Sequence, residues 1–541
     1  MKKIISILLI ISMFATLCAC GGDDTGTLVP VGPGSNGQGS TVVQDVDFDD
    51  DNVLFRFAVI SDVHMSYTYH SEEDILNNAD RFADAMAYMY YLSDGKLDSI
   101  MMCGDYTAIG DINQSTTFAQ ITDVILDDIF GENRPKVMIG MGNHDTHWGG
   151  CMKVNEWYDL LDDYDLCYGL ESDSDFALGN LHLKMENGGK TYHMIYLETE
   201  GYATNVFHPD TVRWLDALLK KITTENPDHY VFIGSHGPIM ESGVYGTDLE
   251  IDAGANWATS KDNLHHTLKK YPQVVYFSGH THFSEYINTT IMQKDYTAMN
   301  VSAVFSMIYY NGTYEKYLGS SSIGRYGGMG YYLEIDKNGS LKIQRVDFSK
   351  SGDAAKTEKL SSGQVPNPLY GRDGESETIS VAKIKSCTLT DDKTVVIHGE
   401  DWILPAPDSE KNHLKYFVDK KGKISKPQFP SGAKVDAYKS GGGAMSFSFP
   451  AAESKDGAFI HHYLVTVKNS DFEKVAEYKI IGNYVDIKDG VINGTSHLDA
   501  TLFGYTMTGL PQIKGCCVEI TAVDEYGNRG GTIFSETFDF N

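Results

Sequence analysis

The 541-residue sequence contains few basic residues. It has 44 lysine and arginine residues against 74 aspartate and glutamate residues, which gives a formal net charge of −30 at pH 7. No basic patch stands out that would neutralise a nucleic-acid backbone, so the composition argues against nucleic acid as a bulk partner. The excess of carboxylates is explained most simply as a feature that keeps the chain soluble.

Cysteine is also scarce, with eight residues in the whole chain. Those beyond the first twenty residues are Cys103, Cys151, Cys167, Cys387, Cys516 and Cys517. Their spacing matches no zinc-ribbon pattern, so a structural metal bound by sulfur is not expected. Cys151 and Cys167 are a plausible local disulfide in an exported chain, whereas Cys103 lies in an apolar run and is expected to be a packed thiol.

The N-terminal apolar run is too short for a comfortable transmembrane helix. Residues 1–20 begin with Lys2-Lys3, continue through the apolar run from Ile4 to Leu17, and end in Leu17-Cys18-Ala19-Cys20. This pattern is typical of an export signal. Its last four residues resemble the lipobox of bacterial lipoproteins, which implies cleavage before Cys20 and a membrane anchor of several acyl chains on that residue. The alternative is an ordinary cleaved signal, and under either interpretation the mature chain works outside the cytoplasm. The lipoprotein interpretation predicts a membrane-anchored protein of the cell envelope, in the periplasm or on the cell surface.

The length of the chain predicts two folded domains plus tails. Residues 21–52 are rich in Gly, Ser and Asp and are expected to form a flexible tether. Between residues 53 and 350, apolar runs of strand length alternate with stretches of helical periodicity. This alternation predicts an α/β domain with a largely parallel inner region. Tyr331–Ile335 and Leu341–Val346, separated by an Asn-Gly turn, are expected to form a hairpin.

The rest of the chain follows a different pattern. Residues 351–377 are rich in Gly, Ser and Lys and are expected to be a linker. Residues 378–541 contain short strands and turns without helical periodicity, which predicts an all-β sandwich domain. The stretch from Gly509 to Asn528 resembles the closing strands of fibronectin type III domains over a short match.

Five apolar runs of the first domain end in side chains that bind metals. The five endings are Asp62-Val63-His64, Gly104-Asp105, Gly142-Asn143-His144-Asp145, His236-Gly237 and Gly279-His280-Thr281-His282. Groups at the carboxyl ends of buried parallel strands meet at one edge of the sheet. Carboxylates, imidazoles and an amide without thiolate are the donors of a two-metal centre, and this set tolerates Mn, Fe or Zn.

The order of these five motifs resembles the signature of the calcineurin-like metallophosphoesterases over roughly residues 53–310. The resemblance implies a four-layer αββα sandwich with a binuclear metal centre, which hydrolyses a phosphoester through an activated hydroxide. It implies Asp62, His64 and His282 as ligands of one metal ion, Asn143, His236 and His280 as ligands of the other, and Asp105 as the bridge. Because Asn143 is neutral, two divalent ions held by this set keep a positive balance toward an anionic phosphate.

The resemblance also implies roles for His144 and Asp145. His144 is expected to contact the phosphate and protonate the leaving group, with Asp145 orienting it, and the alternative is that His144 only supports the site. Many members of the family carry Asp or Asn three residues after the bridging aspartate, and purple acid phosphatases carry a metal-binding Tyr there. This chain has Ala108, which disfavours a purple iron–tyrosinate enzyme. Tyr106 has the wrong offset for a ligand and is expected to be packed or to face the substrate.

The substrate is less well specified by the sequence. Tyr245, Asn256 and Trp257, in the Gly-rich stretch after His236, are candidate substrate contacts, with ordinary loop packing as the alternative. The expected substrate is a small-molecule, lipid or saccharide phosphoester. The Gly-Asn-His-Asp form resembles the phosphodiesterases of the family slightly more than its nucleotidases, which implies a phosphodiester substrate, with the monoesters of a phosphomonoesterase or nucleotidase as the alternative. A non-catalytic surface binding protein with a relic phosphoesterase domain is the alternative of another class, and the intact ligand set argues against it.

Overall fold

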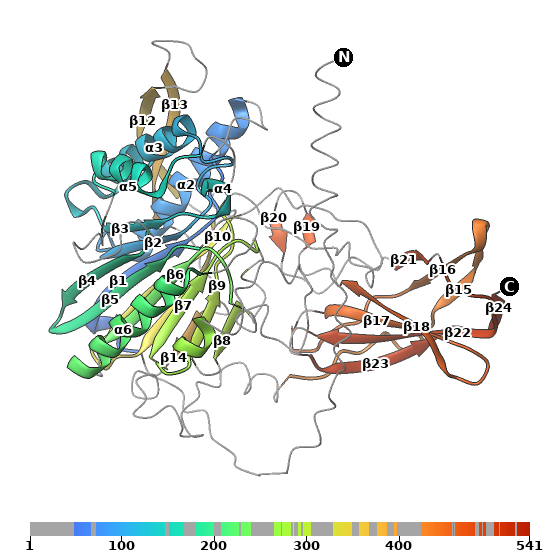
Figure 1. Cartoon of the computed structure of the whole chain (residues 1–541). Coiled ribbons are helices and arrows are strands. Elements are labelled where there is room, and N and C mark those ends of the chain that lie inside the picture. The colour runs from blue at the N-terminus through green and yellow to red at the C-terminus, as the bar shows by residue number, and fades with distance from the viewer. Residues whose placement is uncertain are drawn as a thin grey trace.

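The described residues of the computed structural model fold into an α/β domain and an all-β domain (Figure 1). The structure describes residues 48–65, 72–146, 151–166, 168, 179–199, 207–226, 229–239, 264–271, 273–282, 285, 290–293, 296–304, 328–348, 356–366, 376–386, 394–397, 424–456, 458, 460–481, 486–488, 491–493, 503–507, 509–524 and 527–540. Among the helices in these ranges, none combines the length and the apolar character that crossing a membrane requires. The expected signal sequence and most of the expected tether lie outside them.

Two six-stranded sheets form the centre of the described α/β domain. The first sheet, in the order β14-β11-β10-β1-β2-β3, contains β1 (Val53–Ile60), β2 (Ser99–Cys103), β3 (Lys136–Gly140), β10 (Met329–Asp336), β11 (Leu341–Asp347) and β14 (Thr394–Ile397). The second, in the order β4-β5-β6-β7-β9-β8, contains β4 (Leu181–Asn187), β5 (Lys190–Leu197), β6 (Tyr230–Ser235), β7 (Val274–Ser278), β8 (Ile291–Gln293) and β9 (Thr297–Asn300). Strands β1 to β3, and likewise β5, β6, β7 and β9, run parallel, as their alternation with helices predicts.

The two sheets pack face to face between layers of helices. Aromatic side chains of β1 pack against those of the second sheet. The ring centroids of Phe55 and Tyr192 are 4.1 Å apart and stacked, and those of Phe57 and Phe232 are 4.5 Å apart. The helices are α2 (Glu72–Leu92), α3 (Ile112–Phe130) and α5 (Val154–Asp163) on the first sheet, and α6 (Pro209–Glu225) and the short α7 (His266–Leu268) on the second (Figure 1). This arrangement confirms the predicted four-layer αββα sandwich.

Local sequence signals explain several boundaries of these elements. The Asp111 side chain caps α3 by accepting a hydrogen bond from Gln114 N, and Gly131, with φ of 55°, follows its last residue. Pro209 opens α6 at a position where its missing N–H costs nothing. The predicted hairpin of β10 and β11 is confirmed, and Asp336 stabilises its turn by accepting hydrogen bonds from the backbone N–H groups of Asn338 and Ser340.

The region after β11 differs from the sequence prediction. Strands β12 (Lys356–Pro366) and β13 (Ser376–Ser386) pair as an antiparallel hairpin, so regular structure occupies much of the stretch expected to be a linker. Strand β14 pairs with β11 and extends the first sheet, although its residues fall in the range 378–541 that was expected to belong to the second domain. The physical reason is that β11 offers an unpaired edge, which a strand from later in the chain covers.

The second domain is all-β, as expected. One sheet contains β15 (Asp436–Ser440), β16 (Ala444–Phe449) and β21 (Phe503–Met507), and the other contains β17 (Ile460–Lys468), β18 (Lys474–Ile481), β22 (Ile513–Asp524), β23 (Arg529–Phe534) and β24 (Phe538–Phe540). Side chains of both sheets share one buried core, in which Phe449 meets Tyr463 at 4.9 Å. A separate hairpin joins β19 (Asp486–Lys488) to β20 (Val491–Asn493). The likeness to fibronectin type III domains stays a prediction.

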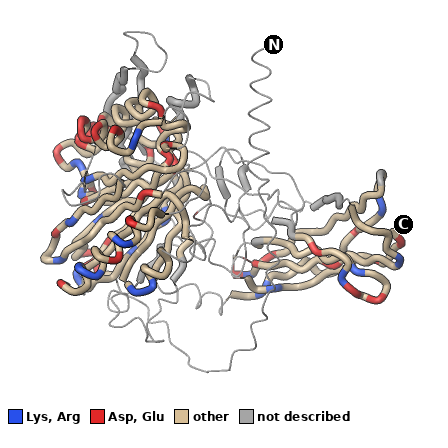
Figure 2. Tube along the Cα trace, viewed as in Figure 1, with Lys and Arg blue, Asp and Glu red and all other residues tan. Residues whose placement is uncertain are grey.

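The charged residues and cysteines fit this framework with one correction. Figure 2 shows acidic positions on the outer helices that cover the first sheet, where Arg134 bridges Asp123 and Asp127 at 2.7 Å each. Cys103 is a fully buried thiol, as predicted. Cys151 is a free cysteine whose Sγ lies 2.9 Å from the Thr146 carbonyl oxygen, so the expected disulfide with Cys167 is not formed. Cys167 itself lies outside the described residues.

Three histidines form a hydrogen-bonded chain in the second sheet. His182 Nε2 lies 2.9 Å from His193 Nδ1, and His193 Nε2 lies 2.9 Å from His229 Nδ1. His193 is buried, and burial, followed by the fields of His182, His229 and Lys184, lowers its pKa to about 3. The chain therefore holds His193 neutral at physiological pH.

We expect this histidine to make folding stability depend on pH. Because the folded-state pKa of His193 lies below its ordinary value of 6.5, the unfolded chain binds the extra proton. Its contribution to the free energy of unfolding is therefore complete above pH 6.5 and declines as the pH falls toward 3. Replacing His193 by Gln should flatten the pH dependence between pH 6.5 and 4, measured by denaturant titration. The exposed His266→Gln variant is the control, and equal slopes for wild type and His193→Gln would contradict the expectation.

Candidate metal centre

The seven predicted ligands all follow strands whose carboxyl ends share one edge of the domain. In the first sheet, Asp62 and His64 follow β1, Asp105 follows β2, and Asn143 opens the short helix α4 (Asn143–Thr146) after β3. In the second sheet, His236 follows β6, and His280 and His282 follow β7. The label of α4 marks this edge in Figure 1. Because both sheets present their parallel strands in this direction, the two sets of side chains meet.

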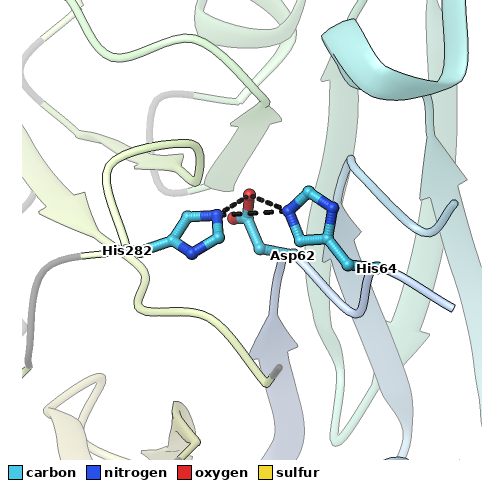
Figure 3. Close-up of side chains that lie close together, drawn as sticks. All are labelled: Asp62, His64 and His282. Atoms are coloured by element: carbon cyan, nitrogen blue, oxygen red, sulfur yellow. Dashed lines mark hydrogen bonds and ion pairs between the residues drawn. The ribbon is translucent and has the colours of Figure 1, made fainter. Parts of the chain in front are cut away.

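One group of ligand atoms consists of Asp62, His64 and His282 (Figure 3). His282 Nε2 lies 2.9 Å from Asp62 Oδ1, and His64 Nε2 lies 3.6 Å from the same oxygen. The two Nε2 atoms are 3.2 Å apart. Three donor atoms from two chain segments, one after β1 and one after β7, therefore converge on one point.

A second group surrounds His236. Its Nε2 lies 2.9 Å from Asn143 Oδ1, 2.9 Å from His280 Nδ1 and 3.1 Å from Asp105 Oδ2. The same Asp105 oxygen lies 3.8 Å from His64 Nε2 in the first group. Asp105 thus stands between the two groups, at the position that the resemblance gives to a bridging ligand.

Hydrogen bonds orient these side chains toward the centre. Asp62 Oδ2 accepts a hydrogen bond from His280 N at 2.9 Å, and Asp105 Oδ1 accepts one from His144 N at 2.8 Å. Each carboxylate therefore uses one oxygen for backbone and turns the other toward imidazole nitrogens. His236 Nδ1 lies 2.7 Å from the Cys103 carbonyl oxygen, which can only accept, so Nδ1 donates this hydrogen bond and Nε2 is the ring atom that faces the centre.

The buried Oδ1 atom of Asp62 tests whether a cation fits. This atom receives no hydrogen bond from the described residues, although two imidazole Nε2 atoms face it. A buried carboxylate oxygen without a donor is costly, and a shared cation satisfies it together with the nitrogens. Nitrogen and oxygen donors in this arrangement suit a divalent transition metal.

The backbone at the centre is strained. Of the eight non-glycine residues with positive φ in the described parts of the chain, five are predicted ligands. They are Asp62, His64, Asp105, His280 and His282, with φ between 47° and 71°. Such conformations are uncommon for residues with a Cβ and persist where the surrounding structure imposes them, which occurs most often at functional sites.

Two motif glycines allow the close approach of these segments. A Cβ atom on Gly142 would lie 2.2 Å from Asp105 Oδ1, and one on Gly279 would lie 1.9 Å from Ser61 Oγ and 2.7 Å from Asp62 Oδ2. Any larger residue would push a carboxylate out of place. The glycines of the sequence motifs therefore serve the packing of the ligands.

The two carboxylates stay ionised despite their burial. Burial alone would raise the pKa of Asp62, but His282 and His236 hold that pKa well below its ordinary value. For Asp105, burial has the same effect and is outweighed by His236 and His144, which lower its pKa. Two negative charges therefore lie inside the protein, close to each other.

The imidazoles around these carboxylates differ in charge. Burial lowers the pKa of His64 to about 4 and that of His280 to about 3, so both rings are neutral at pH 7. Burial also opposes a charge on His236, but Asp105 and Asp62 raise its pKa to about 10. His64 and His280 are thus in the neutral state in which an imidazole binds a metal ion, whereas the two carboxylates favour the charged form of His236.

His144 lies at the margin of the centre. Its ring is half-buried and meets the His64 ring edge to face at 4.8 Å. Its Nδ1 lies 2.9 Å from the Ala108 carbonyl oxygen, which can only accept, so Nδ1 donates the hydrogen bond. The backbone of Ala108 thus orients this ring.

Asp145 does not have the role expected from the sequence. Its carboxylate accepts hydrogen bonds from Thr107 N at 3.0 Å, Thr107 Oγ1 at 2.7 Å, Gly142 N at 2.9 Å and Tyr106 N at 3.3 Å. Burial, followed by the charge of Asp105, raises its pKa to about 6. Asp145 holds the loops after β2 and β3 together, and the expected contact with the His144 ring is made by Ala108 instead.

None of the candidate substrate contacts outside the Gly-Asn-His-Asp motif is seen at the centre in the described residues. Tyr106 is fully buried, its ring stacks on Phe118 and Trp157, and its hydroxyl bonds the carbonyl oxygens of Met102 and Gly140. It is a packed residue and does not face a substrate. Tyr245, Asn256 and Trp257 lie outside the described residues.

The sequence analysis missed two residues that shape the centre. Asn300, at the end of β9, accepts a hydrogen bond from Thr281 Oγ1 at 2.5 Å between His280 and His282. Glu198 follows β5 and accepts one from Met141 N at 2.6 Å, two residues before Asn143. Both are polar residues at the end of an apolar run, so the rule that found the ligands also applies to them.

Part of the chain matches a known protein family. Residues 55–284 match the family model of the calcineurin-like phosphoesterases. No curated protein matches the chain. Among solved structures, the chain is similar to purple acid phosphatase PPD1 from yellow lupin (Lupinus luteus) seeds, with 11% identity and a TM-score of 0.34 over 55% of this chain and 52% of that chain. The match thus spans about half the length of that phosphatase. Residues 55–284 form a calcineurin-like metallophosphoesterase domain.

Proposed function

We propose that the protein is a metal-dependent phosphoesterase. The observation that carries this proposal is the convergence of seven side chains from five strand ends into two groups that meet at Asp105. Strained backbone at five of these residues and the family match of residues 55–284 support the same function. A relic domain would have no reason to keep every donor and the strain that places it.

The ligand assignment follows the two groups. Asp62, His64 and His282 would hold one divalent ion, Asn143, His236 and His280 the other, and Asp105 both. Bound there, Mn, Fe or Zn ions supply Lewis acidity toward a phosphoryl oxygen and lower the pKa of water. The identity of the metal is left open by a donor set of nitrogen and oxygen atoms.

The remaining steps belong to the side chains of this protein. Asn143 is neutral, so it adds no negative charge next to an anionic substrate. His144 Nδ1–H donates a hydrogen bond to the Ala108 carbonyl oxygen, which leaves Nε2 as the atom that gives a proton to the departing oxygen. Asp145 keeps the loops of Asp105 and His144 in register through Thr107 and Gly142.

The enzyme acts in the cell envelope, anchored through a lipid on Cys20. The signal pattern of residues 1–20 supports this location. The chain enters the α/β domain at the start of β1, where Lys337 pairs with Asp49 at 2.6 Å and Lys342 lies 4.5 Å from the Phe48 ring. The ligands of β1 follow its other end, so the anchored segment joins the domain at the edge away from the metal centre.

The metal content of the protein tests the ligand assignment. Purified protein should carry two metal ions per chain after reconstitution with Mn, Zn or Fe, because two complete donor groups are present. Asp105→Asn should lose at least one ion, since Asp105 faces both groups. The buried but distant Asp336→Asn variant is the control and should keep both ions. Elemental analysis that finds no metal in the reconstituted wild-type protein would sink the proposal.

A substrate panel tests the activity itself. We expect the reconstituted protein to hydrolyse small-molecule, lipid or saccharide phosphodiesters faster than the matching monoesters, because the Gly-Asn-His-Asp motif resembles the phosphodiesterases of the family. The measurement is kcat/KM across paired diesters and monoesters of the same alcohol. Asp105→Asn is the inactive control. Faster turnover of the monoesters would reverse the preference, and hydrolysis of neither class would refute the function.

The role of His144 is tested with two leaving groups. His144→Asn should keep both metal ions and lower kcat by about 10²–10⁴-fold for an alkoxide leaving group, the usual scale of general-acid help. For nitrophenolate, which leaves without a proton, the loss should be much smaller. Equal losses on both esters, with metal retained, would show that His144 only positions the phosphate.

A further inference from the structure

We propose that Glu198 is a positioning residue that holds the loop of Asn143 and His144 against the second sheet. Glu198 lies on no ligand motif, and the inference rests on the proposed phosphoesterase function. The second ligand group needs such a residue, because its members come from two different sheets. Asn143 comes from the first sheet, whereas His236 and His280 come from the second, and among the described strands no pairing joins the two sheets.

The backbone N–H and the carbonyl group of Met141 both form hydrogen bonds with the β5 region of the second sheet. Glu198 Oε1 accepts a hydrogen bond from Met141 N at 2.6 Å, and the Tyr196 hydroxyl donates one to the Met141 carbonyl at 3.1 Å. Met141 lies between the end of β3 and Asn143. These two bonds therefore tie the first sheet to the second at the point where the chain turns into the centre.

Glu198 is itself fixed. Its side chain is buried and accepts a hydrogen bond from the Tyr158 hydroxyl at 3.0 Å, while its backbone N–H donates to Asn180 Oδ1 at 3.3 Å. Asn180 in turn bonds Thr211 Oγ1 at 3.1 Å. A Cβ on Gly179 would lie 2.7 Å from Glu198 Cγ, so the neighbouring turn is shaped around this side chain.

The two hydrogen bonds to Met141 help to set the distance between Asn143 and His236, on which the second ligand group depends. Asn143 Oδ1 lies 2.9 Å from His236 Nε2 across the boundary between the sheets. Without the bond to Glu198, Met141 N would be a buried donor with no acceptor, and the loop would shift to satisfy it. A displacement of one ångström at a catalytic group costs about 10²-fold in rate.

The role requires an acceptor oxygen and no negative charge. Burial raises the pKa of Glu198 to about 8, so the group is largely neutral at pH 7. Glutamine offers the same oxygen in the same place. Glu198→Gln should therefore preserve what Glu198→Ala removes, which a loss of charge would not explain.

The experiment compares three variants of the full chain. Manganese binding to the metal-free protein is measured by calorimetry, and kcat and KM are measured on the best substrate of the panel. Glu198→Ala should bind the first ion normally, bind the second more weakly and lose about 10- to 100-fold in kcat with little change in KM. Glu198→Gln should restore both values. Glu334→Ala is the matched control, because Glu334 is also buried in this domain and bonded to a tyrosine, at 2.9 Å from the Tyr332 hydroxyl. It should lose stability and keep both readouts.

Three results would overturn the proposal. These are wild-type binding and kcat in Glu198→Ala, equal losses in Glu334→Ala, or no rescue by Glu198→Gln. If Glu198→Ala does not fold, Tyr196→Phe removes the other bond to Met141 and should weaken the second ion to a smaller extent, with no weakening as the contrary result. A wild-type chain that binds two ions but hydrolyses nothing would refute the proposed function alone, because the manganese titration still reports on Glu198.

Discussion

Two buried carboxylates impose the constraint on which this end of the α/β domain depends. Asp62 and Asp105 stay ionised inside the protein, and burying such charges is tolerated only where other groups balance them. Each gives one oxygen to a backbone N–H and presents the other to imidazoles from a different strand. The strand-end loops are thus held by the same groups that would hold a cation, so ligand placement and local folding are one problem.

Placing the ligands requires strained backbone, and the stability of the rest of the domain offsets the cost of that strain. Left-handed residues such as Asp62 and His280 bring donors inward within a single step of the chain, and glycines such as Gly142 let neighbouring loops approach closely. The large apolar core between the sheets, including the stacked rings of Phe55 and Tyr192, supplies the stability that keeps these loops in place.

The division of the ligands between two sheets is a second consequence. Side chains such as Asp105 and His236 meet only if the sheets keep their relative position at this edge, and pairing within each sheet does not ensure that. Hydrogen bonds across the boundary do, from His236 to Cys103 and from Met141 to Glu198. Residues that are not predicted metal ligands, such as Glu198, therefore also help to set the geometry of the metal centre.

The sequence by itself determined the strands and the polar groups that end them, because an apolar run followed by Asp62-Val63-His64 or Gly279-His280-Thr281-His282 is a local pattern. That pattern predicted the convergence of the seven donors, and the resemblance of the five motifs to a known family implied the four-layer sandwich. The all-β second domain was predicted from short strands without helical periodicity. Tertiary structure decided which groups meet once the loops are packed. Asp145 bonds Thr107 rather than the His144 ring, Tyr106 is buried under Trp157, β14 completes the first sheet, and Glu198 reaches Met141. These partners lie between 38 and 57 positions apart in the chain, so no local pattern pairs them. Tertiary packing brings them together, and the contact of Glu198 with Met141 requires the packing of one sheet on the other.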